Sequence, residues 1–296
     1  ITHLLFRSVI ITFAGKLNLF SMNESVPLTL VVVTYNSPVY LSLTFKSILA
    51  QSVLPEEIIV ADDGSTEPTR EVIDRFREEM NQRSGGKTPV VHIWHPDEGF
   101  RRSAILNKAV AAASGRYIVQ VDGDLVLHPH FIADHRRAAS QGCYVAGSRV
   151  NVGEQKARQT ADTGDIRLSV FSRGMTNFFN GLRIPRLQKP MSRYHIGSIY
   201  HARGCNLAYW REDFLRVNGY DERMTGWGLE DTDLIVRLRH AGVQPRALKM
   251  GGIVFHLWHR TASRSGVNIN EQILQDRIAR KALRCENGVD QYLKNA

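Results

Sequence analysis

Short apolar runs alternate with amphipathic stretches along the first half of the chain. Residues 28–33 form a nearly continuous apolar, largely β-branched run, which is typical of a strand covered on both faces. Ser37 and Pro38 follow shortly afterwards and favour a helix that begins at the proline. Apolar residues such as Leu41 and Phe45 then recur at helical spacing. The pattern therefore predicts a buried strand followed by a helix.

The same unit of strand and helix repeats further along the chain. Strands are predicted at residues 57–61, 90–94 and 117–121, and helices through residues 72–76 and 104–113. Strands that alternate with helices indicate an α/β fold with a doubly wound, mainly parallel central sheet and flanking helices.

Polar clusters follow three of the predicted strands. They are Thr34-Tyr35-Asn36, Asp62-Asp63 and Asp122-Gly123-Asp124. In sheets of this kind, ligands gather beyond the carboxyl ends of the strands. The placement of these clusters predicts a ligand site at that edge of the sheet.

The aspartates of the third cluster are candidates for metal binding. Asp122 and Asp124 are so close in sequence that their charges repel, and burying them unpaired is costly. A divalent cation removes the conflict, and hard oxygen ligands suit Mg²⁺ or Mn²⁺. An isolated Asp-x-Asp triplet is more often a surface turn, but its position at a strand end favours the metal.

Two further segments of the first half have both a structural and a functional interpretation. Asp62-Asp63-Gly64-Ser65 is either a plain turn or a place where a carboxylate binds a base or ribose. Arg101 and Arg102 precede a predicted helix. They form either a diphosphate cradle at the helix N-terminus or a solvated basic turn.

The second half has a weaker pattern between residues 151 and 200 and then two candidate motifs. Glu230 and Asp231 begin a predicted helix at 230–240, directly after the loop Gly226-Trp227-Gly228. A carboxylate there caps the helix or acts as a base, and the indole offers a face for a sugar. Downstream, either His256 or His259 is a candidate to complete the metal shell.

Charge and cysteine content narrow the class of protein. The net charge of +9 indicates a surface that attracts anions such as nucleotides, nucleic acid or an acidic membrane. The three cysteines are widely spaced and form neither a disulfide framework nor a paired metal motif. A reducing cytoplasm is therefore the simpler expectation.

Five motifs occur in an order that matches a known family. They are Val32-Val33-Thr34-Tyr35-Asn36, Asp62-Asp63-Gly64-Ser65, Asn107 in its helix, Val121-Asp122-Gly123-Asp124 and Gly226-Trp227-Gly228-Leu229-Glu230-Asp231. With them the chain resembles the family 2 glycosyltransferases, inverting enzymes with the GT-A fold, over roughly residues 27–260. The last motif is also similar to that of galactosyl- and N-acetylgalactosaminyltransferases.

The resemblance implies a role for each matching residue. It implies that the nucleotide-sugar is bound by Thr34, Tyr35, Asn36, Asn107 and Asp62 or Asp63, and that Asp122 faces the ribose and donor sugar. It implies that Asp124 binds the metal together with His256 or His259. It also implies that Asp231 is the general base and that Glu230 and Trp227 contact a sugar. Many members have an arginine directly before the helix asparagine, where this chain has Leu106. Arg101 or Arg102 is therefore expected to take its place at the diphosphate.

The pattern along the chain, together with the resemblance, predicts an organisation for the chain. We expect an N-terminal extension, disordered or non-native, at residues 1–24. We expect a nucleotide-sugar-binding subdomain at 25–150, an acceptor-binding and catalytic subdomain of the same GT-A domain at 151–265, and a C-terminal helix at 266–296.

The function expected from this resemblance is metal-dependent, inverting sugar transfer. A UDP-sugar is the donor, Mn²⁺ or Mg²⁺ the cofactor, and a saccharide or lipid-linked saccharide the acceptor. Bacterial surface polysaccharide synthesis in the cytoplasm, with peripheral contact at the inner membrane face, is the expected setting, and no nucleic acid partner is expected.

Two alternatives remain at this point. A nucleotidyltransferase predicts a glycine-rich, basic loop after the first strand, where this chain has Thr34-Tyr35-Asn36-Ser37. A non-catalytic basic protein that binds nucleic acid or membrane draws support from the basic, aromatic residues 167–193.

Overall fold

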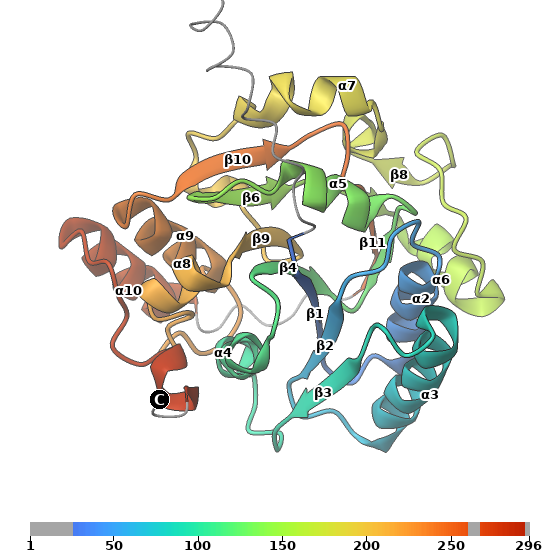
Figure 1. Ribbon diagram of the computed structural model, residues 1–296, viewed down its shortest axis with the longest axis horizontal. Coiled ribbons are helices and arrows are strands. Elements are labelled where there is room, and N and C mark those ends of the chain that lie inside the picture. Colours follow the sequence, from blue (N-terminus) through green and yellow to red (C-terminus); the bar gives the residue numbers. More distant parts are fainter. Residues whose placement is uncertain (1–25, 260–266, 294–296) are drawn as a thin grey trace, which may run out of the picture.

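The computed structural model describes residues 26–259 and 267–293. The predicted extension at residues 1–24 lies outside the described residues. Figure 1 shows that the described chain forms a large central sheet with helices on both of its faces, together with a second, smaller sheet.

The central sheet has seven strands, and most of them are parallel. In sheet order they are β10 (Gln244–Leu248), β6 (Cys143–Gly147), β9 (Asn206–Trp210), β4 (Tyr117–Asp122), β1 (Leu28–Thr34), β2 (Glu57–Asp62) and β3 (Val90–Trp94). Only β9 runs antiparallel to its two neighbours. The predicted α/β fold with a mainly parallel sheet is confirmed.

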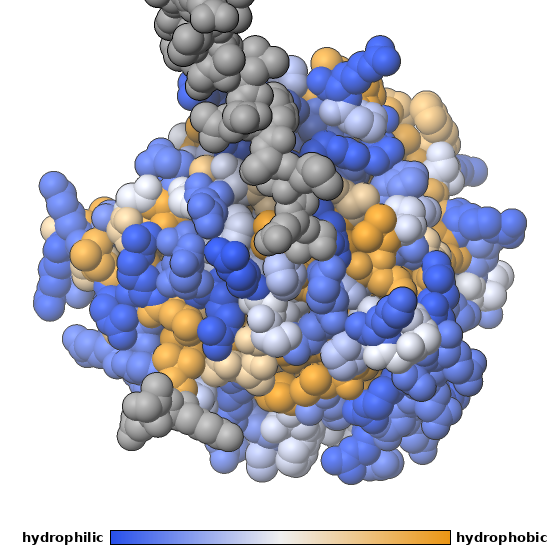
Figure 2. Space-filling view, in the orientation of Figure 1, coloured by the Kyte–Doolittle hydropathy of each residue, from blue (hydrophilic) through white to orange (hydrophobic). Residues whose placement is uncertain are grey.

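The helices cover the sheet in two layers because alternate strand residues face opposite sides. Leu30 and Val32 of β1 pack in one apolar core, and Val31 and Val33 pack in the other. The first core is covered by α2 (Pro38–Leu49), α3 (Glu67–Ser84) and α5 (Phe131–Ala138). The second is covered by α4 (Arg102–Ala112), α8 (Arg211–Arg216) and α9 (Glu230–His240). The outward side of α3, at the lower right of Figure 2, is hydrophilic.

The smaller sheet brings a distant part of the chain back to the end of β4. Its strands, in order, are β5 (Leu125–Leu127), β11 (Val254–Leu257), β7 (Arg149–Val152) and β8 (Met175–Thr176). Because β5 follows β4 after a short turn, the pairing of β11 with β5 sets His256 opposite Leu125. Behind it, an apolar core includes Leu43 of α2 and Ala157 of α6 (Glu154–Thr163).

The segment between α6 and β9 has little regular structure and is held by a buried carboxylate. Its short helices are η1 (Phe178–Gly181), α7 (Pro185–Gln188), η2 (Pro190–Arg193) and η3 (Ile199–His201). Arg183 donates to both oxygens of Asp134 at 2.9 and 2.8 Å, and Gln188 donates to the same carboxylate at 3.1 Å. Burial alone would raise the pKa of Asp134, but these partners hold it below its usual value. The segment is therefore anchored on α5.

The C-terminal part packs against α9. Its helix is α10 (Val267–Ala279), after which the chain is irregular until η4 (Val289–Tyr292). Buried Arg277 of α10 donates to Asp233 of α9 at 3.1 Å and also pairs with Asp221. No helix in the described ranges is long and apolar enough to cross a membrane.

Candidate functional site

The carboxyl ends of β4, β1 and β2 lie side by side and bring the three polar clusters together. Thr34 is the register partner of Asp62, and Val33 is the partner of Asp122. Residues from all three clusters border a cavity of about 1040 Å³. The predicted residues that line it are Thr34, Tyr35, Asn36, Asp63, Arg102, Asp122, Asp124, Trp227, Glu230, Asp231, His256 and His259.

Three predicted residues lie outside the lining of this cavity. Asp62 is buried, where it accepts from the Ser65 amide at 2.8 Å and bonds with His92 at 2.9 Å. Burial would raise the pKa of Asp62, but these hydrogen bonds hold it below its usual value. Arg101 pairs with Glu98.

The third residue outside the cavity, Asn107, is fully buried in α4. Its amide donates to the Tyr220 carbonyl at 2.8 Å and to Glu222 at 2.9 Å, while its oxygen accepts from the Tyr220 amide at 2.8 Å. Asn107 therefore fixes the loop that carries Tyr220, and both of its side-chain polar atoms already have partners in the protein.

Asp63 is the carboxylate of the second cluster that faces the cavity. One oxygen bonds with His95 Nε2 at 2.7 Å, and the other accepts from the Arg101 amide at 3.0 Å. The far nitrogen of His95 lies 3.2 Å from Lys108 Nζ. Sequence reasoning missed both His92 and His95, although two histidines in and just after a predicted strand beside the acidic turn were a usable signal.

Asp124, His256 and His259 form a candidate metal centre. The Asp124 Oδ2 atom lies 3.0 Å from His259 Nε2 and 3.6 Å from His256 Nε2, and one ligand atom from each residue falls within 4.8 Å of the others. The second Asp124 oxygen is buried and has no hydrogen-bond partner in the described parts of the chain. Mixed nitrogen and oxygen ligands suit a divalent cation. The residues therefore fit a divalent cation, and the two imidazoles suit Mn²⁺ better than Mg²⁺, which prefers oxygen ligands.

The electrostatics of this centre favour an ionised carboxylate. Burial alone would raise the pKa of Asp124, but the hydrogen bond from His259 holds it below its usual value. Burial lowers the pKa of His256 and so favours the neutral imidazole that binds metals.

Arg102 joins three carboxylates that come from two distant parts of the chain. It donates to Asp122 at 2.8 Å and to Asp231 at 3.3 Å, and it lies 3.8 Å from Glu230. Burial raises the pKa of Asp122, an effect that Arg102 opposes. Burial and the neighbouring Asp231 raise the pKa of Glu230 to about 7. Arg102 is thus the counter-charge that allows the acidic groups to share one wall.

Asp231 is held from several directions. In addition to Arg102, the Tyr220 hydroxyl lies 3.0 Å from Oδ1, and the Gly204 amide donates to Oδ2 at 2.7 Å. A carboxylate has about four acceptor sites, so one remains for a ligand hydroxyl. Gly204 and Tyr220 were missed from the sequence, because neither residue type is informative outside the fold.

Trp227 stands between two glycines whose backbone conformations favour glycine over other residues. Gly226 has φ 78° and Gly228 has φ 114°, a region that glycine adopts without strain. The indole is 38% exposed and borders the cavity. Other cavity-lining residues that sequence reasoning missed are Tyr40, Phe100, Arg149, Tyr200, Arg203 and Cys205.

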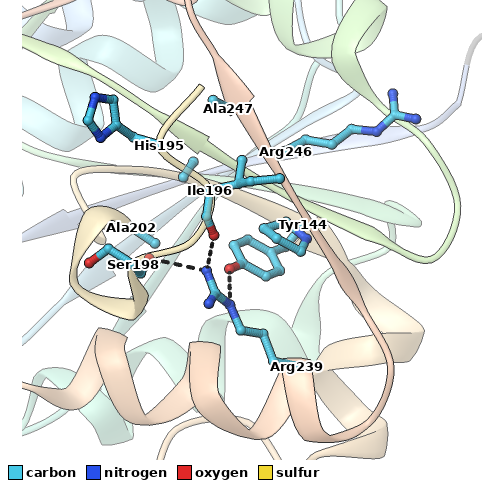
Figure 3. A pocket seen from close by; sticks show the side chains of 10 residues that line it. Tyr144, His195, Ile196, Ser198, Ala202, Arg239, Arg246 and Ala247 are labelled. Carbon is cyan, nitrogen blue, oxygen red and sulfur yellow. Dashed lines mark hydrogen bonds between the residues drawn. The ribbon is translucent and has the colours of Figure 1, made fainter. Parts of the chain in front are cut away.

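A second, much smaller cavity lies behind the wall of the first. It measures about 10 Å³, which leaves room for little more than one water. Figure 3 shows Arg239 of α9 there, bonded to the Tyr144 hydroxyl and to the carbonyls of Ile196 and Ser198. Ala202 lines both cavities. The hydrogen bonds of Arg239 thus fix the loop that forms one wall of the main cavity.

Two protein-family models match parts of the chain. The model "Glycosyl transferase family 2" matches residues 29–214, and the model "N-terminal domain of galactosyltransferase" matches residues 185–260. The second match covers the loop with Trp227 and the acidic pair that follows it.

Curated relatives are similar over most of this chain. Validoxylamine A glucosyltransferase of Streptomyces hygroscopicus subsp. limoneus is 27% identical, covering 73% of this chain and 48% of that protein. Chondroitin synthase of Escherichia coli is 24% identical, covering 85% of this chain and 38% of that protein. The chain thus spans about half, or less, of the length of these relatives.

Solved structures show the same fold at low sequence identity. S. aureus TarS in complex with UDP has a TM-score of 0.58 and 17% identity, covering 90% of this chain and 69% of that one. GalNAc-T7 with UDP, GalNAc and Mn²⁺ has a TM-score of 0.57 and 15% identity, covering 80% and 45%. The chain belongs to glycosyl transferase family 2, a family of enzymes, and has the GT-A fold.

Proposed function

We propose that the protein is a metal-dependent, inverting glycosyltransferase that uses a UDP-sugar. The single observation that carries the proposal is that the triad Asp124, His256 and His259 and the carboxylate Asp231 border one cavity. A metal centre for a leaving diphosphate and a base for an incoming hydroxyl are the two groups that such a transfer needs.

In the donor site, we assign the nucleoside to the end of the cavity formed by Thr34, Tyr35 and Asp63. Tyr35 is half exposed, and its hydroxyl donates to Asp97 at 2.9 Å, which holds the ring beside the cavity. UDP is the nucleotide in the related structures of TarS and GalNAc-T7. Asp122, next to Arg102, is assigned to the ribose and donor sugar.

For the metal, we propose Mn²⁺ or Mg²⁺ held by Asp124, His256 and His259. When bound, the ion would neutralise negative charge on the departing diphosphate. Asp124 serves this role because it is ionised and keeps a buried oxygen without a hydrogen-bond partner among the described residues.

Asp231 is proposed to remove the proton from the acceptor hydroxyl as its oxygen attacks the anomeric carbon. Arg102, Tyr220 and the Gly204 amide fix the orientation of the carboxylate. Glu230 and Trp227 flank it and are proposed to contact the sugars. One base and one displacement invert the anomeric configuration, so an α-linked UDP-sugar gives a β-linked product.

The acceptor is proposed to be a saccharide, carried on a lipid at an anionic membrane surface in bacterial polysaccharide synthesis. Residues 166–204 contain seven arginines and lysines and no aspartate or glutamate. Phe171 and Phe179 are 80% and 70% exposed, and both rings pack against Phe178. Basic and apolar side chains together favour binding to anionic bilayers. Equal sedimentation with phosphatidylglycerol and phosphatidylcholine vesicles would contradict this part of the proposal.

The transfer itself is tested by incubating the protein with Mn²⁺, an acceptor and UDP-galactose, UDP-N-acetylgalactosamine or UDP-glucose. Chondroitin and hyaluronan oligosaccharides are suitable acceptors to begin with, because synthases of both polymers are among the relatives. We expect UDP release that depends on acceptor and metal, and a β-linkage in the product by NMR. A product with retained configuration would exclude the mechanism.

A further inference from the structure

One arginine of the main cavity has no role in the assignments above. Arg149 begins β7, and its neighbours Val150 and Val152 point into the apolar core of the smaller sheet. Because side chains alternate along a strand, Arg149 lies on the opposite face, where it lines the cavity. The adjacent strand β11 places His256 two residues beyond the register partner of Arg149. Arg149 therefore lies on the strand next to the candidate metal centre.

Arg149 forms no salt bridge with a carboxylate in the described parts of the chain. Its Nη1 atom lies 3.8 Å from Cys205 Sγ, and its Nε atom is buried with no hydrogen-bond partner among the described residues. A partly buried guanidinium without an anion is unfavourable. The surroundings of Arg149 thus favour an anionic ligand beside the metal.

The other arginines expected at the diphosphate are already engaged. Arg102 contacts Asp122, Glu230 and Asp231, and Arg101 pairs with Glu98. Releasing Arg102 for a ligand would leave these carboxylates without their counter-charge. Arg149 needs no such release, because it has no acidic partner to give up in the described ranges.

We infer that Arg149 binds the diphosphate of the donor, next to the metal, and takes the place of the arginine that Leu106 replaces. The inference rests on the proposed UDP-sugar donor. Guanidinium and phosphate form charge-assisted, often bidentate hydrogen bonds, so the contact is specific for the phosphates rather than the nucleoside.

Calorimetric binding of UDP and of uridine, each with Mn²⁺, tests the inference on wild type and Arg149→Gln. We expect the substitution to weaken UDP binding about tenfold or more and uridine binding less than twofold. Arg149→Lys, which keeps the charge but not the fork, is expected to lie between the two. Arg75→Gln removes the same charge from an exposed residue of α3, outside the cavity, and is expected to change UDP binding less than twofold.

Two results would overturn the inference. One is UDP binding by Arg149→Gln at wild-type affinity, and the other is an equal loss for UDP and uridine, which would indicate a structural role. Thermal unfolding shows whether each variant is folded. If Arg149→Gln is not folded, the UDP and uridine affinities of Arg149→Lys are compared with those of wild type instead. Wild-type protein that binds no UDP with Mn²⁺ would instead refute the proposed donor itself.

Discussion

Replacing Arg102 by glutamine removes the counter-charge that three carboxylates share. The Arg102 side chain is 12% exposed, and its contacts with Asp122, Asp231 and Glu230 measure 2.8, 3.3 and 3.8 Å. Removing one partner of a buried ion pair costs about 3–5 kcal/mol. The partly exposed Asp122 and Asp231 reduce this figure, so we expect the free energy of unfolding to fall by about 3 kcal/mol at pH 7.

The loss should depend on pH. Glu230 has a folded-state pKa of about 7, above its ordinary 4.5, because of burial and the nearby Asp231. A carboxyl with a raised pKa binds protons more tightly in the folded state, so stability falls as pH rises from the unfolded to the folded pKa. Without Arg102, the folded pKa values of Glu230 and Asp122 rise further. The deficit of the variant should therefore grow between pH 5 and pH 8.

Urea unfolding followed by tryptophan fluorescence measures this deficit at pH 5, 7 and 8. Arg101→Gln is the matched control, because the neighbouring arginine is 35% exposed and, among the described residues, forms a salt bridge only with the surface residue Glu98. Its substitution should change stability by about 1 kcal/mol or less. Equal losses for the two variants, or a deficit of Arg102→Gln that does not vary with pH, would refute the electrostatic account.

Three further substitutions separate chemistry, metal binding and folding. Asp231→Asn should lower kcat by about 10²–10⁴-fold and leave UDP affinity with Mn²⁺ within about twofold. A loss of UDP affinity as large as the loss of kcat would argue against Asp231 as the base. His259→Ala should weaken Mn²⁺ binding at least about tenfold by calorimetry, whereas unchanged binding would remove this residue from the metal centre. Arg277→Met should cost about 3–5 kcal/mol in urea unfolding, because Asp221 and Asp233 each lose a buried partner. The exposed Arg280→Met, directly after the end of α10, should cost about 1 kcal/mol or less. Equal costs for the two variants would contradict a structural role for the buried network.

The parts of the fold that sequence predicted best have a strong hydrophobic pattern. The strand at 90–94 and the helix at 230–240 were predicted with the bounds that the structure has. The helix α6 was missed because it buries only Ala157 and Thr160, which leaves almost no apolar periodicity to detect. A helix that contributes so little to the core is stabilised by contacts with its surroundings, and a local sequence pattern does not reveal these contacts.

Side chains at strand ends were predictable because topology alone brings them together. The function of Arg102 was not, because its partners Asp122 and Asp231 lie 20 and 129 positions away and no local pattern links them. Asn107 shows the same limit, because an asparagine that fixes a loop and one that contacts a ligand look alike in sequence. Sequence identified the motifs, and three-dimensional neighbours decide what each residue can do.

Calorimetric titration of UDP with and without Mn²⁺, on wild type and Asp124→Ala, tests the central claim most directly. The account predicts UDP binding that requires the metal and that the substitution abolishes. Absence of UDP binding under every metal condition, or binding by Asp124→Ala at wild-type affinity, would contradict it.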